Sequence, residues 1–278
     1  MTATDRLAAH YRHGSLEQAI DAGLRKAGRD PGRLVAADLA GVDEFHVGGA
    51  QATRELVGQL GITAGMRLLD IGSGIGGPAR HLAGLGCHVT GVDVMAEYVA
   101  VARSLSARLG MGEQVTFVQG DAAAMDLPAA GFDGATLLHV GMNIADKAGL
   151  AAAVYRALKP GGFFAVYDVM RVGAGEIRYP VPWSSEAEGN FVAAPGVYRA
   201  ALEGAGFVVF AERDRAAFAQ AFFAAMRARM AEAGGPPALG LHLVMGARAG
   251  EKIANLAAAI AGGVLAPVEM LARKGAGK

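Results

Sequence analysis

Short apolar runs alternate along this chain with longer segments in which apolar residues recur every three or four positions. The runs have the length and composition of buried strands, and the segments between them have the periodicity of helices. The strands are predicted at 66–71, 87–93, 115–122, 132–139, 163–169 and 207–212. This alternation over residues 66–212 predicts an α/β fold with a parallel, doubly wound sheet.

Both ends of this alternating region carry helical segments. Leu16, Ile20 and Leu24 form an apolar stripe before the first strand, and a longer helical pattern runs from Asp214 to Ala233. We therefore expect one structural domain built from four consecutive parts. These are an N-terminal helical segment with a flap (1–60), a core (61–212), a helical cover inserted before the last strand (213–263), and the last strand with a tail (264–278).

The first apolar run leads into a glycine-rich turn. Glycine occupies positions 72, 74 and 76, and a helical pattern begins at Pro78. Glycine lets the backbone turn tightly and leaves no Cβ between the chain and a ligand, while the next helix directs its first amides into the same crevice. The turn therefore predicts a nucleotide-type cofactor site at the mouth of the sheet.

Charge narrows the class of cofactor. Asp70 stands two residues before the first glycine, where a carboxylate would repel the pyrophosphate of a dinucleotide. It suits a ligand with a cationic group at this point, such as the amino end and sulfonium of S-adenosylmethionine. An NAD-dependent oxidoreductase is the alternative within the same fold class, and Asp70 disfavours it.

The following strands end in further polar residues. Asp93 lies about 20 residues after the first glycine, where a carboxylate binds a ribose diol. Asp121 and Ala122 close the third strand and are placed to hold an adenine edge. With the Leu158–Gly162 turn before the fifth strand, these residues resemble the class I S-adenosylmethionine-dependent methyltransferases over roughly residues 60 to 210.

The resemblance implies a Rossmann-like, mostly parallel, seven-stranded sheet that binds S-adenosylmethionine and releases S-adenosylhomocysteine. The residues expected to bind the cofactor follow the motifs above and one segment that this superfamily often folds over the ligand. They are Phe45, Asp70, Gly72, Ser73, Gly74, Gly76, Asp93, Val94, Asp121, Ala122 and Leu138.

Three residues are candidates for chemistry. His139 closes the fourth strand and is placed to act as a base, to orient the substrate, or simply to pack against the cofactor. Asn143 follows in the next loop, where it contacts substrate or holds the loop. His46 stands beside two glycines in a segment that suits a closing flap, with a plain linker as the alternative.

The substrate is predicted from residues 171–197 and from the later helix. Tyr179 and Trp183 with Arg171 and Arg178 would hold an amine that also carries a carboxylate, with a proline-stiffened surface loop and an inward-packed Trp183 as the alternative. The stripe Phe218, Phe222, Met226 and Met230 is typical of core packing. If it faces the cleft instead, the substrate is larger and apolar.

The segments 43–49, 138–144 and 179–183 resemble bacterial methyltransferases grouped with sarcosine/dimethylglycine N-methyltransferases, and a wider group that includes ubiquinone/menaquinone methyltransferases. This resemblance favours N-methylation of an amine such as a glycine derivative. The alternatives are O-methylation with His139 as base, C-methylation of an apolar quinone- or isoprenoid-like compound, and a non-catalytic module that binds S-adenosylmethionine.

Composition limits the other partners. The 278 residues carry 26 basic and 26 acidic side chains without a basic stripe, so a small molecule is expected rather than nucleic acid. The histidines show no metal-ligand spacing, and no metal is expected. A single cysteine and the lack of an apolar signal region or a bilayer-length apolar segment favour a cytoplasmic protein without membrane insertion. A homodimer is compatible with the sequence.

Overall fold

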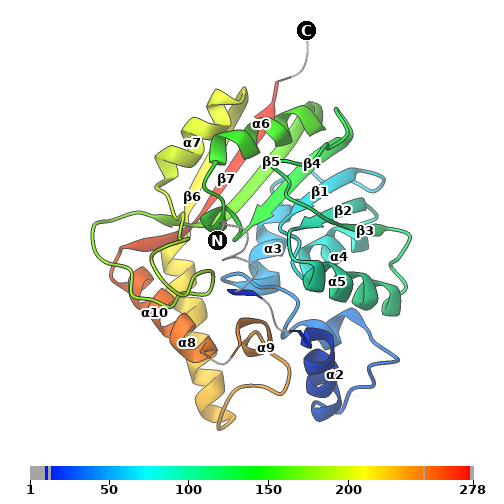
Figure 1. Cartoon of the computed structure of the whole chain (residues 1–278), viewed down its shortest axis with the longest axis vertical. Helices are drawn as coiled ribbons and strands as arrows, with labels where there is room; N and C mark the ends of the chain where they lie inside the picture. The colour runs from blue at the N-terminus through cyan, green and yellow to red at the C-terminus, as the bar shows by residue number, and fades with distance from the viewer. Residues whose placement is uncertain (1–9, 12–13, 247, 276–278) are drawn as a thin grey trace.

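The computed structural model describes residues 10–11, 14–246 and 248–275 and contains one seven-stranded sheet flanked by helices (Figure 1). The ends of the predicted first and last segments, residues 1–9, 12–13 and 276–278, lie outside the described residues. The strands are β1 (Arg67–Ile71), β2 (His88–Asp93), β3 (Val115–Gln119), β4 (Phe132–Leu138), β5 (Leu158–Arg171), β6 (Phe207–Asp214) and β7 (Leu265–Lys274).

The strand order in the sheet is β3-β2-β1-β4-β5-β7-β6. β1 to β5 are all parallel to one another, whereas β7 is antiparallel to both β5 and β6. The order reverses between β1 and β4, and ligands of open α/β sheets bind in the crevice at such a switch point. The predicted mostly parallel, seven-stranded α/β fold is confirmed.

The helices lie on both faces of the sheet and at one end of it. Leu68 and Leu69 are neighbours in β1 yet belong to different buried clusters, as the two-residue period of a strand requires. The clusters pack α3 (Gly49–Val57), α4 (Gly77–Gly84) and α5 (Ala96–Arg108) on one face, and α6 (Lys147–Ala157) and α7 (Pro195–Gly204) on the other.

A cap of helices covers one end of the sheet. Figure 1 shows α2 (Leu16–Lys26) there together with three helices from the segment before β7. Those three are α8 (Ala216–Glu232), α9 (His242–Met245) and α10 (Ala249–Ala261). Two short 3-10 helices complete the described elements: η1 (Ala36–Leu39) lies between α2 and α3, and η2 (Gly141–Asn143) lies between β4 and α6. Among the described residues, no helix is long and apolar enough to cross a bilayer.

Candidate active site

The glycine-rich turn folds tightly against the loop after β4. Gly72 has a φ of 67°, and a Cβ built on it would lie 2.2 Å from Cγ2 of Val140. The amides of Gly72 and Ser73 both donate to the carbonyl of Val92, at 2.8 and 3.1 Å. Only glycine therefore fits at position 72, and the turn is fixed to the end of β2.

A cavity of about 340 Å³ opens above this turn, within the range of small-ligand pockets. Its lining includes every residue that the sequence predicts for the cofactor except Gly76, together with all three candidates for chemistry. Gly76 instead precedes α4, and a Cβ on it would meet the ring of Phe117. Sequence reasoning missed Tyr11, which lines the cavity from the N-terminal segment.

Three buried oxygens of this cavity lack a hydrogen-bond partner among the described residues. One is Oδ2 of Asp70, whose Oδ1 accepts from the Thr136 hydroxyl at 2.8 Å, and the others are Oγ of Ser73 and Oδ1 of Asn143. Burial raises the pKa of Asp70 to about 7 against the lowering effect of Thr136, and Asp93 raises it further. An unpartnered buried carboxylate oxygen is suited to a cationic donor such as the ammonium group of S-adenosylmethionine.

Asp93 is also placed at the cavity wall. Its Oδ2 accepts from the amide of Gly74 at 2.9 Å, and its Oδ1 accepts from the amide of Met95 at 2.8 Å. These bonds tie the end of β2 to the glycine turn. Each carboxylate oxygen can accept more than one hydrogen bond, so the group retains acceptor capacity for a ribose diol.

Hydrogen bonds define the tautomer of His139. The amide of Val47 donates to Nε2 at 3.3 Å, so Nδ1 carries the proton and donates to the carbonyl of Tyr167 at 3.1 Å. Burial, followed by the proximity of His46, lowers the pKa of His139 to about 3. The ring is therefore neutral and joins the segment around Val47 to β5.

His46 belongs to a second buried network. The hydroxyl of Thr53 donates to Oε2 of Glu44 at 2.9 Å and lies 3.0 Å from Nε2 of His46. Nδ1 of His46 lies 3.6 Å from the same carboxylate oxygen. Burial lowers the pKa of His46 to about 4 and raises that of Glu44 to about 8. Both nitrogens of His46 are thus turned toward this pair.

A smaller cavity of about 60 Å³ adjoins the first. Four side chains line both, and we call them the collar: Tyr11, Phe45, His46 and His139. The rest of this second cavity is almost entirely apolar, with Trp183, Phe222 and Met226 in its wall. The stripe on α8 thus contributes Phe222 and Met226 to a cavity next to the predicted cofactor site.

The predicted group of aromatic and cationic residues is not brought together. Arg178 is exposed, and Nη1 of Arg171 donates to the carbonyls of Gly173 and Gly175 at 3.4 and 3.0 Å. Neither arginine lines either cavity. The Tyr179 hydroxyl and Trp183 Nε1 both bind the side chain of Asn190, at 2.6 and 2.9 Å. Of the four residues, the structure places only Trp183 at a cavity wall.

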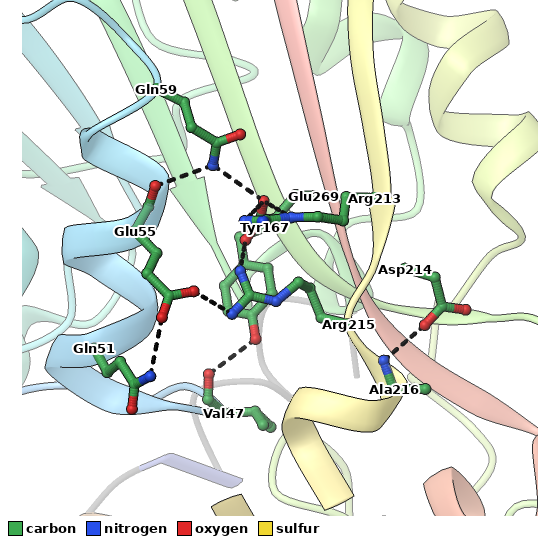
Figure 2. Close-up of polar contacts among 10 residues, drawn as sticks. All are labelled: Val47, Gln51, Glu55, Gln59, Tyr167, Arg213, Asp214, Arg215, Ala216 and Glu269. Atoms are coloured by element: carbon green, nitrogen blue, oxygen red, sulfur yellow. Dashed lines mark hydrogen bonds and ion pairs between the residues drawn. The ribbon is translucent and has the colours of Figure 1, made fainter. Parts of the chain in front are cut away.

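An ion-pair network next to the collar joins α3 to the sheet, as Figure 2 shows. Arg215 binds Glu269 on β7 and, at 2.6 Å, Glu55 on α3. Glu269 is paired across the strands with Tyr167, whose hydroxyl donates to the carbonyl of Val47 at 2.9 Å. These contacts fix α3 and the chain before it to the sheet.

Comparisons with known proteins agree with this geometry. Residues 69–166 match the family model described as a methyltransferase domain. A sterol 24-C-methyltransferase of Eremothecium gossypii is 34% identical over 183 residues, which cover 63% of this chain and 48% of that protein. The chain thus spans about half the length of this relative.

Solved structures share the fold across nearly the whole chain. Phosphoethanolamine N-methyltransferase 2 of Haemonchus contortus, bound to S-adenosyl-L-methionine, superposes with a TM-score of 0.75 at 20% identity over 99% of this chain and 60% of that one. Geranyl diphosphate C-methyltransferase of Streptomyces coelicolor A3(2) gives 0.69 at 15% identity, over 99% and 98%.

Residues 69–166 therefore match a methyltransferase domain. This confirms, for the domain, the enzyme class and the cofactor that the sequence predicts. The matching relatives include sterol C-methyltransferases, so the comparisons do not point specifically to the sarcosine/dimethylglycine or quinone methyltransferases that the sequence resembles. Among the residues that the structure describes, no group of three or more potential ligands is arranged to hold a metal ion.

Proposed function

We propose that the whole chain is an S-adenosylmethionine-dependent methyltransferase that methylates a carbon atom of an apolar small molecule. The observation that carries this proposal is the apolar second cavity, which adjoins the cofactor cavity at the collar. An acceptor in the second cavity and a methyl donor in the first would meet at these four side chains.

The residues of the first cavity supply binding and orientation. Asp70 and Ser73 offer their unpartnered oxygens to the amino-acid end of the cofactor, Asp93 to its ribose, and the Asp121–Ala122 turn to its adenine. When bound, S-adenosylmethionine supplies a methyl group activated by the neighbouring sulfonium. The protein then has to align the acceptor and exclude water, and the apolar wall of the second cavity is suited to this task.

The state of His139 argues against an oxygen acceptor. Removing a proton from a hydroxyl before methyl transfer requires a base, and the lowered pKa of about 3 makes His139 a poor one for that task. An alkene needs no such step, because its π electron pair forms the new bond to the methyl carbon as the methyl–sulfur bond breaks. The other alkene carbon would then be cationic, and a carbon bonded to it would lose a proton, so that the C–H electron pair forms a new double bond.

A carbocation is a very strong acid, so even a weak base accepts its proton. Nε2 of His139 holds an unprotonated lone pair at the collar, engaged only by the 3.3 Å contact from the Val47 amide. We assign to Nε2 of His139 the role of accepting the proton that the carbocation loses. The name of the Eremothecium gossypii relative, a sterol 24-C-methyltransferase, supports the same class of acceptor.

N-methylation, which the sequence favours, would need a polar pocket for the amine. Arg171 and Arg178 lie outside both cavities, and apolar side chains dominate the lining of the second. Burying an ammonium or carboxylate there without partners costs several kcal/mol or more. The positions of these residues therefore favour the carbon acceptor over the glycine derivative.

The test is a methylation assay with S-adenosylmethionine carrying an isotopic label in its methyl group. The panel contains prenyl alcohols, glycine-type amines and phenols, and product analysis locates the label. We expect label on carbon of the alkenes. Label on amine nitrogen alone would overturn the proposal, and binding of S-adenosylhomocysteine without any turnover would favour the non-catalytic module.

A variant tests the role of His139. His139→Asn keeps an N–H that can donate to the Tyr167 carbonyl but removes the proton acceptor, so we expect the rate of C-methylation to fall about 100-fold or more. Binding of S-adenosylhomocysteine to the variant, measured by calorimetry, is the control for folding. An unchanged rate would show that another group takes the proton.

A further inference from the structure

The second cavity is smaller than a sterol or geranyl diphosphate, the molecules that appear in the names of the similar proteins. At about 60 Å³ it has about one-sixth of the volume of the first cavity, which is about 340 Å³. It therefore suits a short apolar group, such as a dimethylallyl end. A longer acceptor therefore fits only if part of the wall gives way.

Hydrogen bonding makes the cavity selective for apolar groups. Trp183 Nε1, which lies in its wall, already donates to Asn190 Oδ1 at 2.9 Å. Both nitrogens of His46 and Nδ1 of His139 are engaged in the networks described above, while Nε2 of His139 is the proton acceptor of the proposed reaction. A polar group placed among the apolar side chains of the wall would lose its hydrogen bonds to water without replacement, which costs free energy.

The stripe on α8 shows where this cavity ends. Phe222 and Met226 line it, whereas Met230, one turn further along the same face, does not and is 37% exposed. Residues four apart on a helix are about 6 Å apart along the axis. The side chain of Met226 therefore lies between the cavity and the exposed end of the stripe.

We propose that Met226 is a specificity-determining residue that closes the outer end of the second cavity and limits the size of the acceptor. The inference rests on the proposed function, because it assumes that the acceptor occupies this cavity. Met→Ala removes three non-hydrogen atoms from this wall and so enlarges the cavity at that end. Longer acceptors would then extend past position 226 toward Met230.

The single tryptophan of the chain provides a direct measure of binding. Trp183 lies in the wall of the cavity and is buried, so its emission reports an occupant. The probes are prenyl alcohols of five, ten and fifteen carbons, titrated into the full-length protein in the presence of S-adenosylhomocysteine. We expect the wild-type protein to bind the five-carbon alcohol most tightly.

In Met226→Ala, the ratio of affinities for the ten- or fifteen-carbon alcohol over the five-carbon alcohol should rise at least tenfold. Met226→Leu keeps the volume and should retain the wild-type ratio, which separates size from damage to the fold. Met230→Ala is the matched control on the same helix and should also leave the ratio unchanged. An unaltered ratio in Met226→Ala would overturn the inference.

Failure of the proposed function gives a different result. In that case the alcohols bind and the ratio shifts in Met226→Ala, but no methylated product forms when S-adenosylmethionine replaces S-adenosylhomocysteine. The binding titration thus tests Met226 by itself, and the product analysis tests the reaction.

Discussion

The unpartnered oxygen of Asp70 makes cofactor binding depend on pH. Asp70 is 1% exposed, and burial raises its pKa to about 7, so without a ligand it is about nine-tenths protonated at pH 6 and about one-tenth at pH 8. An ammonium group beside it favours the ionised form. Binding at pH 6 must therefore release close to one proton, and binding at pH 8 close to none.

The free energy of this contact follows from its burial. A hydrogen bond to a charged partner contributes about 1.5–3 kcal/mol, and the buried position leaves little screening by solvent. We expect Asp70→Asn, which keeps the shape and can still bond to Thr136, to weaken S-adenosylhomocysteine binding about 10- to 150-fold at pH 8. It should also abolish the proton release at pH 6.

Calorimetric titration with S-adenosylhomocysteine in two buffers of different ionisation enthalpy measures both quantities. Thr136→Val is the matched control: it removes the 2.8 Å hydrogen bond that lowers the pKa of Asp70 and should move the proton release to higher pH. The reasoning is refuted if wild-type protein releases no proton at pH 6, or if Asp70→Asn binds as tightly as wild type.

Three further predictions concern the turn and the segment before α3. Gly72→Ala should destabilise the protein by more than Gly110→Ala in denaturant unfolding, because both have positive φ, costing about 1–3 kcal/mol, but only position 72 also meets Val140. Between pH 6.5 and 8, the free energy of unfolding of Glu44→Gln should rise relative to that of the wild type by about 1.4 kcal/mol per pH unit. The reason is that the folded wild type keeps Glu44 protonated up to a pKa of about 8, whereas the unfolded chain does not. Denaturant titrations measure both proteins, and parallel dependences on pH would contradict this prediction. Hydrogen exchange across residues 35–50 should slow when S-adenosylhomocysteine binds, and strong protection in both states would show a fixed wall instead of a flap.

The fold and the cofactor cavity could be predicted because local rules decide them. An apolar run followed by spaced glycines can form few structures other than a strand and a tight turn, and the close approach of Val140 to Gly72 shows why. The Asp146 side chain likewise accepts from the Gly149 amide at the start of α6, as expected for an N-cap. The strand, the turn and the cap each depend on residues close in sequence, whereas the contact with Val140 is a long-range one that excludes a side chain at position 72.

The acceptor side could not be predicted in the same way. Arg171 and Arg178 stand close to Tyr179 in sequence, but irregular segments direct neighbouring side chains apart, and Arg171 instead binds backbone carbonyls of its own loop. Tyr11 reaches the collar from the N-terminal segment, and Met226 reaches the cavity from the cap. The helical periodicity predicts which face of α8 carries Met226. It does not predict which part of the protein that face contacts.

The short segment 43–48 contacts helix α4, strand β5 and helix α8. Asp43 is paired with Arg80 of α4, and Val47 is bonded to both His139 and Tyr167. Gly48, with a φ of 91°, lies so close to Phe218 that a Cβ would meet the ring at 2.3 Å, and the guanidinium of Arg215 lies 4.0 Å from the centre of that ring. A shift of this segment therefore changes the walls of both cavities at once, and coupling of this kind is reciprocal, so an occupant that orders it from one cavity favours binding in the other.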